Sequence, residues 1–307
     1  MGGGAWRWAT RERAGLRGGT ETAVVPAAAG VIGVPVPADR VEAALPDIWR
    51  RSSEKGAQRF AKAILTTDRG TKGARATSPA GKKQYSVLGI AKGAGMIHPN
   101  MATTLGFVVT DAPVAPADLR SALRRAAEQT FNRITVDGDT STNDMVLAMA
   151  SGQGRVLSGK TLRVFEARLE HVLWRLAMQI VADGEGAQHV AKIVVEGAGT
   201  ERQALALART IATSQLVKTA LHGEDPNWGR ILGAAGRAGV AFDPEHAQVR
   251  IGDVVVYHDG VTTMSPRVER RAASVMRKKS YTITLRLQSG AARAHYWTCD
   301  LGHDYDS

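Results

Sequence analysis

The chain has 307 residues, and 44% of them are hydrophobic, which is typical of a globular protein with one large core or two smaller ones. Its apolar runs are all shorter than the roughly 20 residues that a membrane-spanning helix needs, so a membrane protein is not expected. The net charge is +11, but the basic residues are scattered and no aromatic residues interleave with them. This charge therefore predicts a solvated surface with some attraction for carboxylate substrates, and no nucleic-acid binding.

Helices and strands are predicted along most of the chain after its first 23 residues, which show no periodicity and are expected to be disordered. Apolar residues at helical spacing predict helices over 38–49, 58–65, 113–130, 162–181, 204–213 and 227–238. Runs rich in β-branched residues predict strands over 85–90, 104–109, 192–196, 249–258 and 281–287. The segment 162–181 has the clearest apolar stripe and is expected to be a core helix. This mixture predicts an α/β fold.

Cys299 is the only cysteine, so an internal disulfide is impossible and a reducing compartment, the cytoplasm, is expected. A thiol nucleophile beside His295 and His303 is one interpretation of this residue. A packed small residue next to Trp297 is the favoured one. No group of histidines and cysteines has the spacing of a zinc site, so no metal is predicted.

Two patterns resemble ligand-binding motifs but are rejected. Residues 154–161 match the P-loop of nucleotide-binding proteins, but Asp183, at the end of the next helix, is no good partner for a magnesium ion. Nucleotide binding is therefore a remote hypothesis. The sequence from Asp137 begins like a calcium loop but has Thr142 at the sixth position, where the turn needs glycine, and Ala148 at the twelfth, where a bidentate glutamate is required. A polar network around a turn is predicted over 137–144 instead.

The most informative stretch is Lys92-Gly-Ala-Gly-Met-Ile-His-Pro-Asn-Met-Ala-Thr-Thr-Leu105, which has a lysine and a glycine-rich turn ahead of Ala102-Thr103. A threonine hydroxyl becomes a useful nucleophile when the threonine is the first residue of a chain, since its own α-amine then acts as the base. The reference pKa of such an amine is about 7.7–8.0, so a useful fraction is neutral near pH 7. Gly93 and Gly95 permit the backbone conformations that self-cleavage needs.

The stretch resembles the cleavage point of the ornithine acetyltransferases, which are self-processing enzymes of arginine biosynthesis. Further blocks match this family in the same order, from about Ala29 to Tyr305. They are Thr66-Thr-Asp68, Phe131-Asn132 with Val136-Asp-Gly-Asp-Thr-Ser-Thr-Asn-Asp144, Gly184-Glu-Gly-Ala187, Leu216-Val-Lys-Thr-Ala220 with Gly223-Glu-Asp-Pro-Asn-Trp-Gly-Arg230, and Trp297-Thr-Cys-Asp-Leu301.

The resemblance implies an α/β/β/α layered fold and an acetyltransferase that moves acetyl from N-acetylornithine to glutamate after cleavage between Ala102 and Thr103. It implies a remnant of the α chain over residues 29–102, a β chain over 103–307, and a heterotetramer of two α and two β chains. Residues 1–28 are then an atypical N-terminal segment. No cofactor is implied, and the use of acetyl-CoA as a second donor is left open, as is the exact acceptor.

The family's functional residues carry over by position. Thr103 matches the nucleophile, and Lys92 matches a substrate-contacting lysine suited to a carboxylate. Thr66 matches a substrate-contacting threonine, with Thr67 as the alternative if the register is off by one. Glu185 matches a glutamate that contacts substrate, where it can hold the ammonium group of ornithine.

The sequence also departs from the family. The threonine and glycine of the family's oxyanion hole correspond to Ala29, which lacks a hydroxyl, and to Gly30. The family carries roughly a hundred residues before this block, and the sequence before Ala29 does not resemble it, which suggests a frame shift or a wrong start. The family also continues beyond Tyr305 to an Asn and a Thr that contact substrate. A truncated or degenerate, non-catalytic family member is therefore the alternative hypothesis.

Overall fold

The computed structural model describes residues 25, 27–28, 33–79, 84–98, 104–141 and 143–305. The chain divides into two compact units, residues 1–64 and 65–307. In the first unit the structure describes two helices, α2 (Ala38–Arg50) and α3 (Ala57–Ala63), which confirms the helices predicted at 38–49 and 58–65. No residue of α2 is buried among the described residues, and Ile48, on its apolar face, is 55% exposed.

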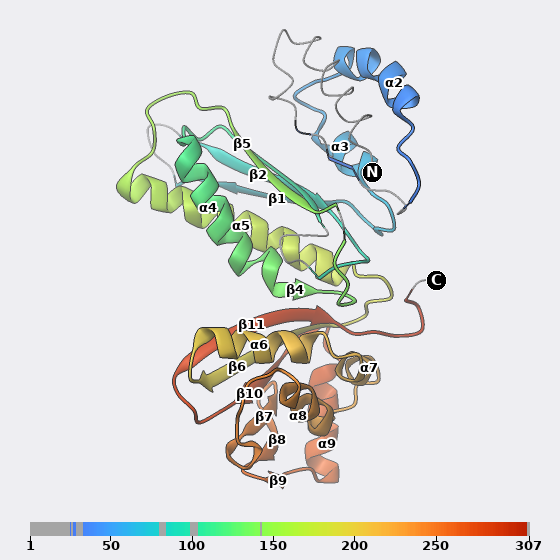
Figure 1. Cartoon of the computed structure of the whole chain (residues 1–307), viewed down its shortest axis with the longest axis vertical. Helices are drawn as coiled ribbons and strands as arrows, with labels where there is room; N and C mark the ends of the chain where they lie inside the picture. The colour runs from blue at the N-terminus through green and yellow to red at the C-terminus, as the bar shows by residue number, and fades with distance from the viewer. Residues whose placement is uncertain are drawn as a thin grey trace. The chain divides into compact units, whose positions relative to one another are not determined.

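The second unit contains a four-stranded sheet in the order β1-β2-β3-β5 (Figure 1). Its strands are β1 (Lys72–Thr77), β2 (Ser86–Lys92), β3 (Leu105–Thr110) and β5 (Met145–Ala150). Strands β2 and β3 confirm the prediction that two strands flank the glycine turn, and they pair antiparallel with Lys92 opposite Leu105. Strand β5 runs parallel to β3. Strands β1 and β5 were not predicted, because the alternating pattern of β1 relies on small alanines that carry little β signal.

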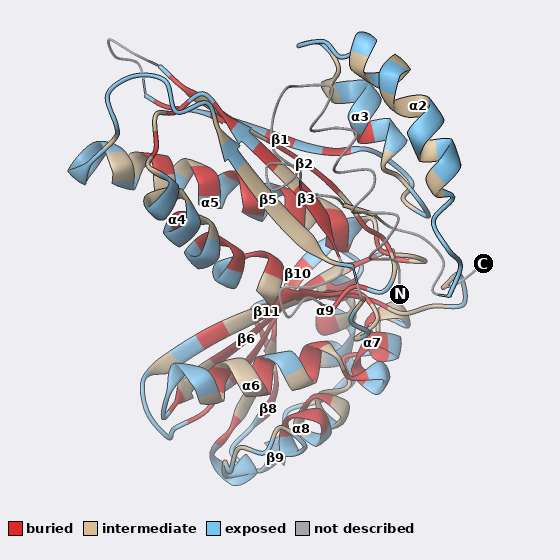
Figure 2. Cartoon of the chain, turned by 45° about the horizontal axis from the view of Figure 1, so that its top comes forward, coloured by how far each residue is buried: buried red, intermediate tan, exposed pale blue. Residues whose placement is uncertain are grey.

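Helices α4 (Pro116–Gln129) and α5 (Gly159–Ala182) cover one face of this sheet (Figure 2). The stripe predicted for the segment 162–181 is confirmed, since its core residues from Phe165 to Ile180 are fully buried. Helix α5 approaches β2 closely at Gly89, where an added Cβ would lie 2.6 Å from Val172 Cγ1. The glycine therefore sets the distance between the sheet and its helical layer.

A seven-stranded sheet, in the order β4-β11-β6-β10-β7-β8-β9, forms the rest of the second unit. Its strands are β4 (Ile134–Thr135), β6 (Val190–Ala198), β7 (Gln248–Ile251), β8 (Val254–His258), β9 (Val261–Thr262), β10 (Ser280–Arg286) and β11 (Ala292–Cys299). Its helices are α6 (Glu201–Ala212), α7 (Gln215–His222), α8 (Trp228–Gly236) and α9 (Pro266–Met276). The single strand predicted at 249–258 is instead the hairpin β7–β8, because Gly252 turns the chain at φ 59°.

The two sheets and their helices confirm the α/β class. One core lies between the four-stranded sheet and α4 and α5, and a second surrounds the seven-stranded sheet with α6 to α9. The C-terminal end of α5 also reaches β4 and β11, so the segment after α5 lies where the two layers of this unit meet. None of the helices in the described ranges is long and apolar enough to cross a membrane.

Candidate active site

The glycine turn after β2 is the centre of the candidate site. Lys92 ends β2 opposite the first residue of β3. The carbonyl of Thr104, which precedes β3, accepts the N–H of Met145 at 2.9 Å. The cleavage pair Ala102 and Thr103 lies outside the described residues, as do Ala29 and Gly30. The nucleophile, the cleavage and the oxyanion positions therefore stay predictions, while the residues around them can be located.

Lys92 and Thr66 lie together, as the resemblance implied. The Lys92 ammonium donates to the Thr66 hydroxyl at 3.3 Å. Burial lowers the pKa of Lys92, and the nearby carboxylates of Asp68 and Asp144 oppose this effect. The hydroxyl beside the lysine is that of Thr66, which favours Thr66 over Thr67 as the residue that contacts substrate.

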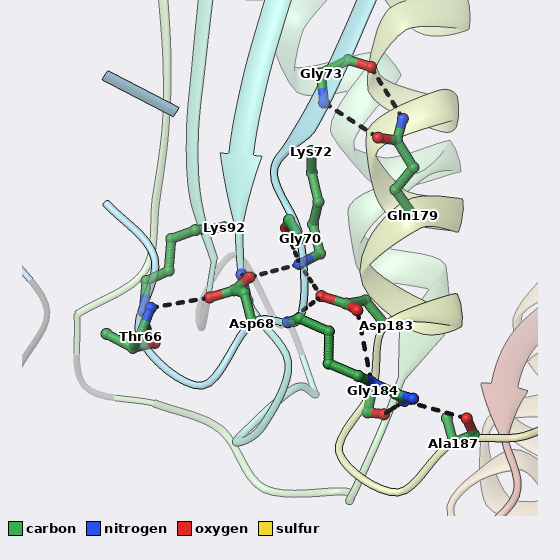
Figure 3. A network of polar contacts seen from close by, with 12 residues as sticks. Thr66, Asp68, Gly70, Lys72, Gly73, Lys92, Gln179, Asp183, Gly184 and Ala187 are labelled. Carbon is green, nitrogen blue, oxygen red and sulfur yellow. Dashed lines mark hydrogen bonds and ion pairs between the residues drawn. The ribbon is translucent and has the colours of Figure 1, made fainter. Parts of the chain in front are cut away.

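A buried ion network fixes the base of the turn (Figure 3). The Lys72 ammonium lies between two carboxylates, at 2.5 Å from Asp68 Oδ1 and 2.5 Å from Asp183 Oδ2. Lys72 is 2% exposed and the Asp68 side chain is fully buried. Asp68 also accepts the N–H of Gly93 at 2.6 Å. The network therefore joins β1, the glycine turn and the C-cap of α5.

This network was not predicted, because Lys72 and Asp183 are 111 residues apart and neither belongs to a matched block. Burial raises the pKa of Asp68, but the hydrogen bonds from Lys72, Gly93 and Thr66 outweigh it and leave the pKa below its usual value. Asp68 is therefore held ionised beside the turn. The matched Thr66-Thr-Asp68 block was the one sequence signal that pointed to this region.

Glu185 lies against the same turn. Its N–H donates to the Ala94 carbonyl at 3.0 Å, and a Cβ added to Gly95 would lie 2.6 Å from the Glu185 carboxyl atoms. A side chain at position 95 would displace that carboxylate from its place against the turn. The Arg69 guanidinium holds the segment by donating to the carbonyls of Gly184 at 2.9 Å and Ala187 at 3.1 Å.

The polar network predicted at 137–144 is confirmed, and it wraps the turn from the other side. The Asp137 carboxylate accepts the N–H groups of Met96 at 2.5 Å, Ile97 at 2.9 Å and Asp139 at 3.0 Å. The positive φ of Met96, 56°, is stabilised by these bonds. Both carboxylate oxygens of Asp137 accept backbone amides, and the described residues contain no group of three or more metal-ligating side chains that could hold a metal ion.

Asp144 is a further group that the sequence did not single out. Burial raises its pKa to about 7, and the charge of Lys92 opposes this shift. Within the described part of the chain, neither Asp144 Oδ2 nor the buried Thr104 Oγ1 has a hydrogen-bond partner. Thr104 directly precedes β3 and Asp144 directly precedes β5. Because these two strands pair, the two side chains come close together, which could not be read from the matched block.

The residues of the P-loop match have structural roles at the two ends of α5. Thr161 Oγ1, the P-loop hydroxyl, donates to the Ser158 carbonyl and forms the capping box at the start of α5. Asp183 caps the other end of α5 and pairs with Lys72. Cys299 is fully buried, and burial raises the pKa of its thiol, so the favoured interpretation as a packed residue is confirmed.

Comparison with known proteins agrees with this arrangement. A model of the ArgJ family matches residues 5–307. The chain belongs to the ArgJ family. The match begins well before Ala29, so the start of the resemblance predicted from the sequence is too late. The reason is that all the motifs that indicated the family lie after Ala29.

Individual members of the family are similar over most of the chain. The "Arginine biosynthesis bifunctional protein ArgJ" of Symbiobacterium thermophilum is 46% identical over 283 residues, which cover 91% of this chain and 70% of that protein. The protein of the same name from Methylococcus capsulatus is 45% identical over 298 residues, covering 95% and 72%. A crystal structure of the Bacillus halodurans ArgJ protein superposes with a TM-score of 0.61 at 38% identity, over 64% of this chain and 94% of that one. The family and fold class inferred from the motifs are thus confirmed.

Proposed function

We propose that this chain is an acetyltransferase of arginine biosynthesis that moves acetyl from N-acetylornithine to glutamate through an ester on Thr103. The observation that carries the proposal is the convergence on one glycine turn of Lys92, Thr66 and Glu185. Strand pairing sets Lys92 opposite Leu105, two residues after the proposed nucleophile. Membership of the ArgJ family supports the same reaction.

The nucleophile is made by self-cleavage. Thr103 Oγ attacks the Ala102 carbonyl, the peptide C–N bond breaks, and the acyl group is carried as an ester on the hydroxyl. Water then hydrolyses this ester and leaves a carboxylate on Ala102 and a free α-amine on Thr103. That amine is the base for the second reaction, because a threonine hydroxyl is otherwise a weak nucleophile.

Acetyl transfer follows in two steps. The Thr103 amine accepts the hydroxyl proton while Oγ attacks the acetyl carbonyl of N-acetylornithine. The amide C–N bond then breaks and ornithine leaves with the proton. In the second step the amine group of glutamate attacks the acetyl-Thr103 ester. The ester C–O bond breaks, the proton returns to the Thr103 hydroxyl, and N-acetylglutamate leaves. Lys92 and Thr66 suit the carboxylate end of the amino acids, and Glu185 suits the ammonium end.

The oxyanion of each step is assigned to the Ala29 and Gly30 positions, where the Gly30 amide is the available donor. A hydroxyl donor at such a position is worth on the order of 100- to 1000-fold in rate. Ala29→Thr should therefore raise turnover more than it changes substrate affinity. An unchanged rate in a chain that cleaves itself would exclude Ala29 from the oxyanion hole.

The remaining assignments extend the same proposal. The enzyme needs no bound cofactor, and acetyl-CoA is a second donor to be tested beside N-acetylornithine. The cut chain assembles as a heterotetramer of two α and two β chains, and it works in the cytoplasm. The family resemblance carries the assembly and the donors, and the single cysteine carries the compartment. Native mass tests the assembly, and donor assays test acetyl-CoA.

Intact mass spectrometry tests the central step. Under denaturing conditions the chain should give two fragments that meet at Ala102 and Thr103, and Thr103→Ala should stay whole. N-acetylornithine alone should then add one acetyl mass to the fragment that begins at Thr103. An acetyl group on a lysine, or a wild-type chain that stays uncut, would contradict the proposal and favour a non-catalytic member.

A further inference from the structure

A cavity in the second unit is lined by residues of α4 and β5 and by the residues just before β3 and β5. It has a volume of about 210 Å³ and lies between α4 and the start of β5. Gly89 of β2 faces α5, so strand alternation points Lys92 to the other face of the sheet. Neither Lys92 nor Thr66 lines the cavity, although the charge of Lys92 acts on Asp144, which does line it. Apolar side chains form its walls, namely Leu123, Ala127, Phe131, Met145 and Val146.

Two of the residues that line the cavity carry buried polar atoms without partners in the described residues. They are Thr104 Oγ1, on a residue that is 3% exposed, and Asp144 Oδ2. A buried polar group that lacks a hydrogen bond is unfavourable until a partner supplies one. Asp144 accepts hydrogen bonds when ionised, so the partner that suits these atoms carries N–H groups and positive charge.

Helix α4 contributes positively charged side chains to the cavity. Arg120 and Arg124 both line the cavity and are exposed. Four residues apart on a helix, they lie on the same face and offer two guanidinium groups to one anion. The cavity thus has an anion-binding rim, apolar walls and buried, inner atoms that accept hydrogen bonds.

We infer that this cavity binds a small zwitterion with a primary ammonium at one end of an aliphatic chain and a carboxylate at the other. The ammonium contacts Asp144 and Thr104, the methylenes pack on the apolar walls, and the carboxylate meets Arg120 and Arg124. This site is additional to the proposed acetyl-transfer site. Its inner contact, Thr104, directly follows Thr103 in the sequence.

Calorimetry on the intact chain tests the inference with ω-aminoalkanoates of five to eight carbons. Hexanoate lacks the ammonium and hexylamine lacks the carboxylate, so these are the matched control ligands. At least one aminoalkanoate should bind tenfold more tightly than both. Equal affinity of a control, or no binding across the series, would overturn the inference.

Proton release gives a second readout of the inner contact. The pKa of the free Asp144 carboxyl is about 7, with Lys92 as the opposing charge from β2 and Arg120 and Arg124 as the cations on α4. An ammonium bound to Asp144 should then release up to about half a proton at pH 7, measured in buffers of different ionisation enthalpy. No release would place the ammonium elsewhere and refute the inner contact.

Variants locate the bound ligand. Arg124→Gln and the cavity-filling Ala127→Leu should each weaken binding at least tenfold. Arg125→Gln is the control, since Arg125 pairs with Glu166 and does not line the cavity. Thr66→Val, which changes no charge, should leave affinity unchanged; a loss there would show that the probe occupies the acetyl-transfer site. Equal effects of Arg124→Gln and Arg125→Gln would also overturn the assignment, and Arg124→Gln decides the matter if Ala127→Leu fails to fold.

Discussion

At the scale of single residues, Lys72 is the group on which the candidate site depends most for stability. It is buried between two carboxylates, and Lys72→Met would remove the cation between Asp68 and Asp183. The half-exposed Arg69 guanidinium, 3.7 Å from Asp183, would then be the remaining ion-pair partner among the described residues. Removing one partner of a buried ionic network typically costs about 3–5 kcal/mol. We expect a loss of this size in urea denaturation.

The matched control for Lys72 is the exposed pair of Arg271 and Asp253, whose side chains are 57% and 77% exposed. Exposed pairs contribute about 0–1 kcal/mol, so Arg271→Gln should change the free energy of unfolding little. Equal losses from the two variants would show that burial of Lys72 adds nothing to the stability of the network.

The raised pKa of Asp144 predicts how the free energy of unfolding depends on pH. Its pKa is raised to about 7 in the folded chain, against about 3.9 when unfolded. Between these values the folded state holds a proton that the unfolded state has lost. The contribution of Asp144 to stability is therefore full below about pH 4 and falls as the pH rises through 7.

Asp144→Asn removes this titration. Relative to that variant, the wild type should lose on the order of 2 kcal/mol between pH 4 and pH 8, a value discounted for partial exposure. Parallel stability profiles of the two proteins would show that Asp144 keeps an ordinary pKa. The lowered pKa of Asp68 acts with the opposite sign, since its contribution is lost as the pH falls below about 4.

At the scale of elements, the contact between β2 and α5 depends on Gly89. A Cβ there would lie 2.6 Å from Val172 Cγ1 and 2.7 Å from Leu176 Cδ1, both in the packed core. Gly89→Ala should destabilise the fold by about 1–3 kcal/mol through overpacking, as measured by thermal unfolding.

Gly73, in the adjacent strand β1, is the control for Gly89. A Cβ added there meets only the Gly89 carbonyl, at 3.9 Å, so Gly73→Ala should cost less than 1 kcal/mol. If both alanine variants unfold at the same temperature, close helix–sheet packing is not the reason for glycine at position 89.

At the scale of the whole molecule, the proposed cleavage falls between strands that pair with each other. Strands β1 and β2 precede Thr103, and β3, β5 and α5 follow it. The ladder between β2 and β3 and the packing of α5 on β1 and β2 join the two fragments. We expect cut chains to stay together in native conditions and to separate only in denaturant.

Native and denaturing mass spectrometry check this expectation. The native mass should contain both fragments, while the denatured sample should contain each alone. Thr103→Ala is the control, since it should give one mass in both conditions. A native sample in which the fragment after Thr103 appears alone would contradict the strand pairing that we describe.

The sequence by itself determined the features that are encoded within short stretches of chain. The apolar stripe from Phe165 to Ile180 requires only helical periodicity, and α5 has it. The paired strands around the glycine turn follow from runs on each side of it. The family and the residues Lys92, Thr66 and Glu185 were likewise found from ordered blocks of residues.

Only the tertiary structure decided which distant charges meet. Lys72 and Asp183 are 111 residues apart and pair because α5 returns its C-terminal end to β1. Asp144 and Thr104 open onto one cavity because β5 pairs with β3 in parallel register. The physical reason is that burial and the partner of a charge depend on which segments pack together, and no local pattern carries that information.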